Sequence, residues 1–319
     1  MPRTTSPTRR SRLARITAAL VVLAALCGYM TVQYITSSKV VDGCVVESAD
    51  GSAGERRTFR MSPEQAVNAA TIAAVGTSRG MPERAVTIAL ATALQESGLR
   101  NIEHGDRDSL GLFQQRPSQG WGTGKQILDP VYSAGEFYRH LAEVPGYSRL
   151  PLTVAAQRVQ RSGYPQAYAK HEPDAALLSA ALTGRTPAAL NCSPPRATAA
   201  GADPAKVRAE LVRAFGKDVL PAVDKAPAEG AGAAGSAAAG VVSVPVPPAR
   251  EPAEGSGKDA GSGGAARRGW ELAHWAVAQS EALRLDRVSY GGRVWEAGAG
   301  WRTERDGAGG TDVRIRLAR

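Results

Sequence analysis

Histidine and cysteine are scarce in this sequence of 319 residues, which contains four histidines and three cysteines. The histidines lie far apart, without the spacing of metal ligands, at His104, His140, His171 and His274. A glycine-rich phosphate loop, a Ser/His/Asp set and an internal repeat are also missing from the sequence. We therefore expect no metal and no cofactor.

The chain has an excess of basic residues, with a formal net charge of +9. Its first residues are rich in arginine, and an apolar run follows at 16–35. Roughly 20 apolar residues span a bilayer, and a basic flank stays on the cytoplasmic side. This pattern predicts a single-pass membrane anchor with a cytoplasmic N-terminus and extracytoplasmic main domains. A cleaved signal peptide is the alternative, but the run is long and no clear cleavage site follows it.

An extracytoplasmic position determines how the charge and the cysteines are interpreted. The positive charge then suits an anionic wall polymer rather than nucleic acid. Cys27 lies in the apolar run, whereas Cys44 and Cys192 lie beyond it and are expected to form one disulfide. Closing a loop of about 150 residues stabilises a fold by roughly 4–5 kcal/mol in the chain-entropy model. Two free buried thiols are the alternative.

Local patterns divide the chain into four parts. Residues 1–38 form the basic stub and anchor, 43–216 a folded domain, 222–266 an Ala/Gly/Pro-rich linker, and 267–319 a small α+β module. The folded domain begins with two short strands within 43–60. Helices follow at 62–80, 82–97, 130–144, 151–162, 173–183 and 203–216.

The last module contains a helix, a Gly-Gly hairpin and a final strand, together with four tryptophans. Trp270 and Trp275 lie five residues apart on the expected helix, which favours a packing role over glycan binding.

The helix at 82–97 is apolar on nearly all sides, so it is expected to be central in its domain. It nevertheless ends with the acid Glu96, where the helix dipole disfavours a negative charge. Burial beside Leu94, Leu112 and Phe113 would raise the pKa of Glu96 further. A carboxylic acid that stays protonated near neutral pH is the general acid that glycosidic bond cleavage requires.

Two segments, "ALQESGLRN" and "SLGLFQQRP", resemble the soluble lytic transglycosylase and goose-type lysozyme family, and the match covers roughly residues 62–183. Other segments, including "GDRDSLGLFQQRPSQGWGT", resemble a group of membrane-anchored actinobacterial wall proteins. The resemblance implies a mainly α fold: a lysozyme-like helical domain with a short N-terminal β-hairpin, a small C-terminal α+β module and a single transmembrane helix.

The resemblance also implies the residues of a site. Glu96 matches the catalytic acid of the family. The segment "AAQRVQRSGYPQAY" stands where the family has A-Y-N-x-G, so Gln160 and one of two tyrosines replace the usual Asn and Tyr. The expected substrate-binding residues are Ser109, Gly111, Gln114, Gln115, Trp121, Gln160, Tyr164 and Tyr168.

The resemblance implies that the partner is the glycan strand of peptidoglycan and that the reaction is lytic transglycosylation with Glu96 alone. A hydrolytic lysozyme that inverts needs a second carboxylate, for which Asp106 and Asp108 are the candidates. The alternative for these two acids is a turn in which they cap backbone amides and pair with Arg107. The other hypothesis is a wall-binding scaffold that has the fold without the activity.

Overall fold

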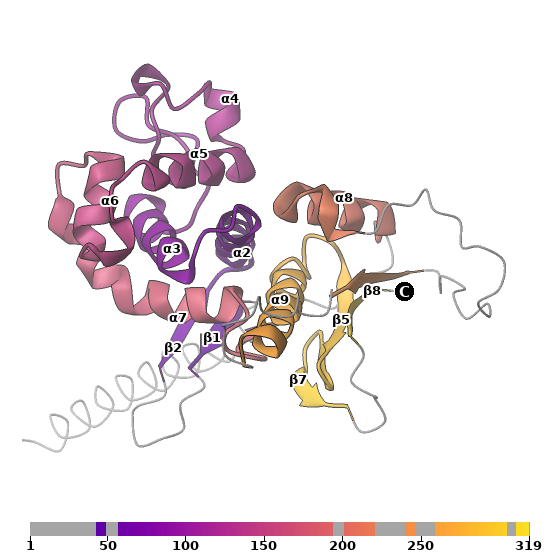
Figure 1. Cartoon of the computed structure of the whole chain (residues 1–319). Coiled ribbons are helices and arrows are strands. Elements are labelled where there is room, and N and C mark those ends of the chain that lie inside the picture. The colour runs from indigo at the N-terminus through magenta and orange to yellow at the C-terminus, as the bar shows by residue number, and fades with distance from the viewer. Residues whose placement is uncertain are drawn as a thin grey trace, which may run out of the picture. The chain divides into compact units, whose positions relative to one another are not determined.

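The computed structural model describes residues 43–48, 57–193, 201–220, 240–246, 259–304 and 311–318. All of them belong to one compact unit, Asp42–Arg319 (Figure 1). Helices make up about 50% and strands 17% of the structure, and the strands form two sheets. The prediction of a mainly α fold was therefore wrong, because three further strands, at Leu190–Cys192, Val241–Pro245 and Gly300–Thr303, join the expected ones to complete two sheets.

The smaller sheet joins the two ends of the helical region. Its three strands, in the order β2-β1-β3, are β1 (Cys44–Glu47), β2 (Thr58–Met61) and β3 (Leu190–Cys192). Both neighbours of β1 run antiparallel to it, and Cys44 lies opposite Cys192. The predicted disulfide between these two cysteines is confirmed, and it joins positions that are 148 residues apart in sequence.

The helices between these strands follow the capping signals of the sequence. Ser62 and Gln65 form a reciprocal capping box at the first helix, with Pro63 in its first turn. The second helix ends at Gly98, whose φ of 64° is a left-handed conformation that favours glycine. The helices between β2 and β3 are α2 (Pro63–Ser78), α3 (Glu83–Ser97), α4 (Gly124–Ile127), α5 (Pro130–Ala142), α6 (Leu152–Gln160) and α7 (Glu172–Leu182), and α8 (Pro204–Phe215) follows β3.

Helix α3 occupies the centre of the helical region, as its composition predicted. It packs against α2, α5, α6 and α7, and every side chain from Ala85 to Ala93 is buried. The helical region also contains the 3₁₀ helices η1 (Pro117–Gln119), η2 (Tyr147–Arg149), η3 (Pro165–His171) and η4 (Lys217–Val219).

The C-terminal part forms an antiparallel sheet of five strands in the order β4-β8-β5-β6-β7. Strand β4 lies inside 222–266, the range expected to be a linker, and helix α9 begins in the same range. The elements are β4 (Val241–Pro245), α9 (Asp259–Ala278), β5 (Leu285–Tyr290), β6 (Arg293–Glu296), β7 (Gly300–Thr303) and β8 (Asp312–Leu317).

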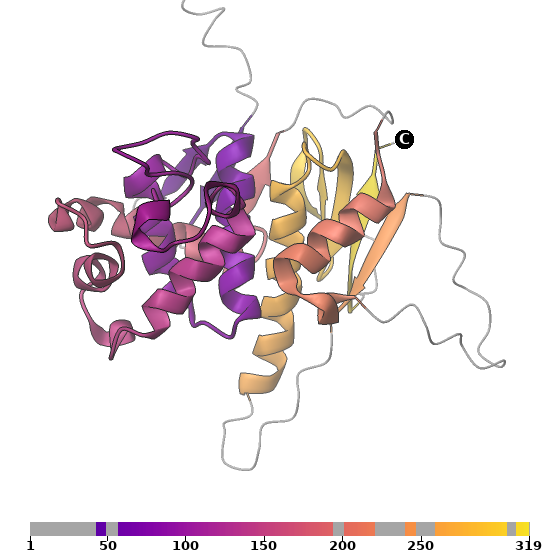
Figure 2. The same ribbon diagram turned by 90° about the horizontal axis from the view of Figure 1, so that it is seen from above.

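Helix α9 connects the sheet to the helical region. It contacts β5 and β8 as well as α2 and α7 (Figure 2), and Trp270 and Trp275 of α9 are buried, as the packing role requires. Nδ1 of His274 donates to the carbonyl oxygen of Ala181 at 2.7 Å, and the Ala189 amide donates to Nε2 at 3.2 Å. These contacts place both parts of the chain around one continuous core.

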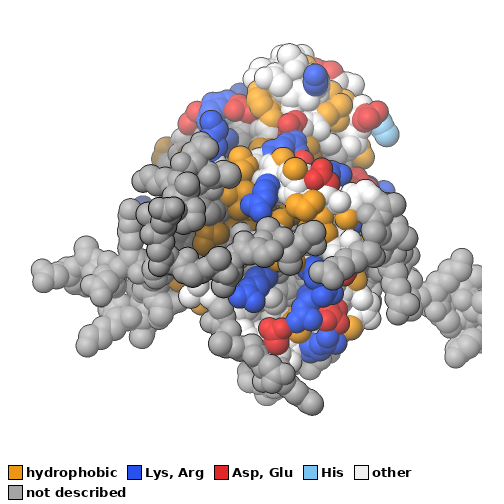
Figure 3. Space-filling view, turned by 90° about the vertical axis from the view of Figure 1, so that its right-hand side faces the viewer, with side chains coloured by type: hydrophobic (Ala, Val, Ile, Leu, Met, Phe, Trp, Pro, Cys, Tyr) orange, Lys and Arg blue, Asp and Glu red, His pale blue; other side chains and the backbone are white. Residues whose placement is uncertain are grey.

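The face of the five-stranded sheet that points away from α9 is polar. Arginines and acids alternate on it, with Arg287 3.1 Å from Glu296 and Arg316 2.8 Å from Asp286. Figure 3 shows acidic and basic side chains next to one another on the side of the molecule that carries these strands.

Among the residues that the structure describes, no helix is long and apolar enough to cross a membrane. This finding corrects the expectation of a transmembrane helix and of a membrane location, which was drawn from an apolar run. That run, 16–35, and the whole predicted stub, 1–38, lie outside the described residues.

Candidate active site

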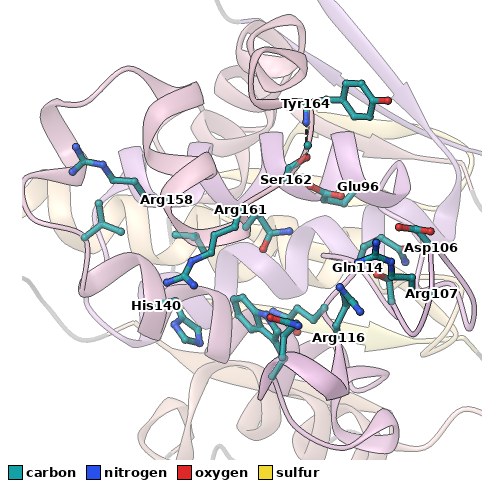
Figure 4. A pocket seen from close by; sticks show the side chains of 18 of the residues that line it. Glu96, Asp106, Arg107, Gln114, Arg116, His140, Arg158, Arg161, Ser162 and Tyr164 are labelled. Carbon is teal, nitrogen blue, oxygen red and sulfur yellow. Dashed lines mark hydrogen bonds between the residues drawn. The ribbon is translucent and has the colours of Figure 1, made fainter.

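A groove with a volume of about 950 Å³ runs across the helical region beside Glu96 (Figure 4). Four segments form it: the end of α3, the loop over residues 106–121, the end of α5 and the turn over 158–164. The segments come from positions up to 68 residues apart in sequence, and packing around α3 brings them together.

Glu96 lies in the last turn of α3 and is half-buried. The hydroxyl of Tyr168 donates a hydrogen bond to its Oε1 at 2.5 Å. Burial raises the pKa of Glu96 above its usual value, while the hydrogen bonds from Tyr168 and Gln160 oppose this effect. The Glu96 carboxyl group therefore keeps its proton to a higher pH than an exposed glutamic acid does. The hydrogen bond from Tyr168 also fixes its orientation.

Two hydrogen bonds hold the end of α3 in place, one to the loop that follows it and one to α2. The hydroxyl of Ser97 donates to the carbonyl oxygen of Leu112 at 2.8 Å, and the Asn68 amide donates to that of Leu99 at 2.9 Å. Because these residues flank Glu96, they fix the position at which the carboxyl group enters the groove.

The two candidate tyrosines have different environments. Tyr168 is fully buried in η3, and burial together with the charge of Glu96 raises its pKa, so it stays a hydrogen-bond donor. Tyr164 is 80% exposed at the rim of the groove. Gln160 donates from Nε2 to the carbonyl oxygen of Phe113 at 2.7 Å. Tyr168 and Gln160 are therefore the pair that the structure brings to Glu96.

The loop after α3 supplies two of the expected substrate-binding side chains to the groove. Ser109 and Gln114 both line it, and Gln114 has a φ of 48°, which is rare for a residue with a side chain. Gly105 lies close beside it: a Cβ there would lie 1.8 Å from Oε1 of Gln114, so a larger residue would displace this side chain. Strained backbone of this kind is common at binding sites.

Gly111 and Gln115 serve the fold more than the groove. Gly111 has a φ of 75°, and a Cβ there would lie 2.8 Å from the carbonyl oxygen of Ile127. It does not line the groove, so its close contact is with protein rather than with the expected saccharide. Gln115 borders the groove, but it is buried and donates to the carbonyl oxygen of Ser133 at 3.0 Å.

Trp121 lines the groove next to His140, with ring centroids 4.3 Å apart. Burial lowers the pKa of His140, and the positive charges of Arg139 and Arg161 act in the same direction. A half-buried indole in this position is suited to stacking on a sugar ring.

The two acids considered as a second carboxylate lie in different surroundings. Asp108 accepts from Nε of Arg116 at 2.7 Å and from the Ser118 amide at 2.9 Å, which holds its pKa well below the usual range. It does not line the groove, whereas the exposed Asp106 does. The expected turn with a paired aspartate is present, but the partner of Asp108 is Arg116 rather than Arg107.

No model of a known protein family matches this sequence, and no curated protein matches it either. Within the described parts of the chain, no three His, Cys, Asp or Glu side chains are grouped so that they could hold a metal ion.

The basic residues of the groove were not predicted from the sequence. Besides His140, they are Arg107, Arg116, Arg158 and Arg161. The signal was present, because Arg158 and Arg161 flank Gln160 in the segment already singled out. Which way these side chains point depends on where α6 ends, and the sequence does not specify that.

Proposed function

We propose that the protein cleaves the β-1,4 bond between N-acetylmuramic acid and N-acetylglucosamine of peptidoglycan as a lytic transglycosylase. The observation that carries this proposal is the Glu96 carboxyl group in a groove, with a raised pKa and a hydrogen bond from Tyr168. A protonated carboxyl group next to open space for a glycan meets the first requirement of glycosidic bond cleavage.

In the proposed reaction, Glu96 acts as both acid and base. Because Tyr168 occupies Oε1, the proton resides on Oε2 and passes to the bridging oxygen as the bond from that oxygen to C1 of the muramic residue breaks. The resulting carboxylate accepts the proton of the C6 hydroxyl while the C6 oxygen bonds to C1. The products are a 1,6-anhydro end and a free hydroxyl, and Glu96 is protonated again.

The position of Asp108 favours this reaction over hydrolysis with inversion. A hydrolase of that type needs a second carboxylate that holds water about 6.5–9.5 Å from the acid. Asp108 is held by Arg116 and Ser118 and does not line the groove. Asp106 is the remaining acid for a hydrolytic route, because it does line the groove.

The test is to incubate the full chain with purified peptidoglycan and to analyse the released fragments by mass spectrometry. We expect anhydro ends from the parent and no release from Glu96→Gln, with an unchanged melting temperature. Glu103→Gln is the matched control, because Glu103 is an exposed acid nearby that does not line the groove. Reducing ends would show a hydrolase instead, and binding without release would show a wall-binding scaffold.

A further inference from the structure

We propose that Arg158 and Arg161 form an anion-binding subsite of the groove, in which each side chain binds a carboxylate or phosphate group carried by the glycan. The inference rests on the proposed function, because it names the part of the wall polymer that this groove would recognise. The two arginines lie at the C-terminal end of α6, and both line the groove; their side chains point in different directions, that of Arg161 towards His140 (Figure 4).

The groove carries an excess of positive charge near Arg158 and Arg161. Four arginines and three acids line it, but two of the acids offer little negative charge to a neighbour: Glu96 has a raised pKa, and Glu143 pairs with Arg139 at 3.0 Å. Arg116 is neutralised by Asp108 at 2.7 Å. The excess positive charge therefore lies on Arg107, Arg158 and Arg161, and two of these three are on the same wall.

The backbone at Arg161 is in a conformation that arginine rarely adopts. Its φ of 51° and ψ of 38° are left-handed, a region that usually selects glycine at the end of a helix. A glycine is present only two residues later, at Gly163, yet the arginine occupies the strained position. Such strain, when it is retained in a groove, points to a role for the side chain.

Helix stabilisation alone does not explain where these side chains lie. Positive charges near the C-terminus of a helix interact favourably with its dipole. In the described part of the chain, however, neither guanidinium group donates to a carbonyl oxygen or pairs with a carboxylate. Arg161 extends towards His140, whose pKa its charge helps to lower.

A free guanidinium group is suited to binding an oxyanion. It presents five N–H donors in a planar fork that matches the paired oxygens of a carboxylate or a phosphate. On a bacterial wall, carboxylates come from the peptides on the muramic residues, and phosphates come from polymers attached to the glycan. Both sources offer the same chemistry to the subsite.

The test compares two double variants for binding to wall fragments by co-sedimentation, each made in the Glu96→Gln background so that the fragments are not consumed. One is Arg158→Gln/Arg161→Gln. The control is Arg149→Gln/Arg208→Gln, which removes the same charge from exposed positions outside the groove. We expect a roughly tenfold loss of affinity in the first and less than a twofold loss in the second, because guanidinium hydrogen bonds to an oxyanion add specific binding to the general attraction of opposite charges.

Treated fragments distinguish the sources of the anion. Amidation of the wall carboxylates should lower the affinity of the Glu96→Gln protein to that of the groove variant if the anion is a carboxylate. Removal of phosphate-linked polymers with hydrofluoric acid should do so if it is a phosphate. Neutral N-acetylglucosamine hexamer should bind both double variants equally well.

Equal loss in the two double variants, or no loss in either, would overturn the subsite. Failure of the proposed function has a separate readout, since it would appear as the absence of anhydro products from the parent protein. Both double variants should melt within about 2 °C of the Glu96→Gln background. A core mutation shifts the melting temperature by more than this, so this result excludes misfolding as the cause.

Discussion

The hydroxyl of Tyr168 lies 2.5 Å from Oε1 of Glu96 and joins two positions that are 72 residues apart in sequence. Tyr168 is fully buried, and its raised pKa keeps the phenol protonated. Oε1 of the carboxyl group therefore has a permanent donor, and Gln160 is a second donor to the group.

Tyr168→Phe should change the pH dependence of wall cleavage. The Tyr168 hydrogen bond lowers the pKa of Glu96, so its removal raises that pKa further. Because the reaction needs the protonated acid, the alkaline limb of the pH–rate profile should move to higher pH. The maximal rate should fall about tenfold, since the carboxyl group loses its fixed orientation. Tyr164→Phe, at the exposed rim, should leave the profile unchanged, and an identical profile in both variants would contradict the assigned role.

Asp108→Asn should leave the chemistry of the product unchanged. Asp108 pairs with Arg116 and caps the Ser118 amide, so its loss should loosen the loop and lower the melting temperature. Activity should fall less than tenfold, and mass spectrometry should still find anhydro ends. A loss on the order of 10³-fold in rate, typical of removing a catalytic group, would make Asp108 part of the reaction.

The protein should lose stability in mild acid because of His274. Burial lowers the pKa of this side chain from 6.5 to about 4, so the folded state disfavours its proton. The free energy of unfolding should be highest above pH 6.5 and should fall by about 3 kcal/mol as the pH drops towards 4. Denaturant titrations at several pH values would measure this slope.

A His274→Gln variant separates this effect from that of the buried Glu271. Burial raises the pKa of Glu271, so its contribution is present at low pH and is lost as the pH rises above 4.5, which is the opposite trend. The variant should be less stable at pH 7 but should lack most of the acid-induced loss. If parent and variant show the same slope, His274 is not the group responsible.

A chain that ends at residue 220 should not fold cooperatively. Such a chain lacks α9, which covers α2 and α7, and it lacks Trp301, whose Nε1 donates to the carbonyl oxygen of Leu190 at 2.8 Å. Circular dichroism during heating should show a broad transition, and a hydrophobic dye should bind to the uncovered core. Addition of a separate 240–319 fragment is the control, because it should restore a sharp transition. A truncated chain that melts at the temperature of the parent would show that the helical region folds independently.

Local signals predicted the elements around the site well. The Ser62 and Gln65 capping box, the end of α3 at Gly98 and the position of Glu96 in the last turn all depend on neighbours within a few residues. The Gly-Gly hairpin between β5 and β6 also depends only on residues that are close in sequence.

Features that depend on distant partners were not predictable from the sequence. Strand β4 lies in an Ala/Gly/Pro-rich stretch, and its partner β8 follows about 70 residues later. The choice of Tyr168 over Tyr164 depends on the path of η3, and the reason for a glycine at position 111 depends on Ile127 in another segment. The basic wall of the groove depends on the left-handed end of α6 at Arg161.

The disulfide between Cys44 and Cys192 encloses every residue of the groove within its loop. Tension applied to the chain before the first cysteine and after the second therefore passes through a single covalent link. The helices that hold Glu96 and its partners bear no part of that load. While the link is intact, the groove can keep its shape in a protein that is being pulled from both sides, and reduction would place the same helices directly in the path of the force.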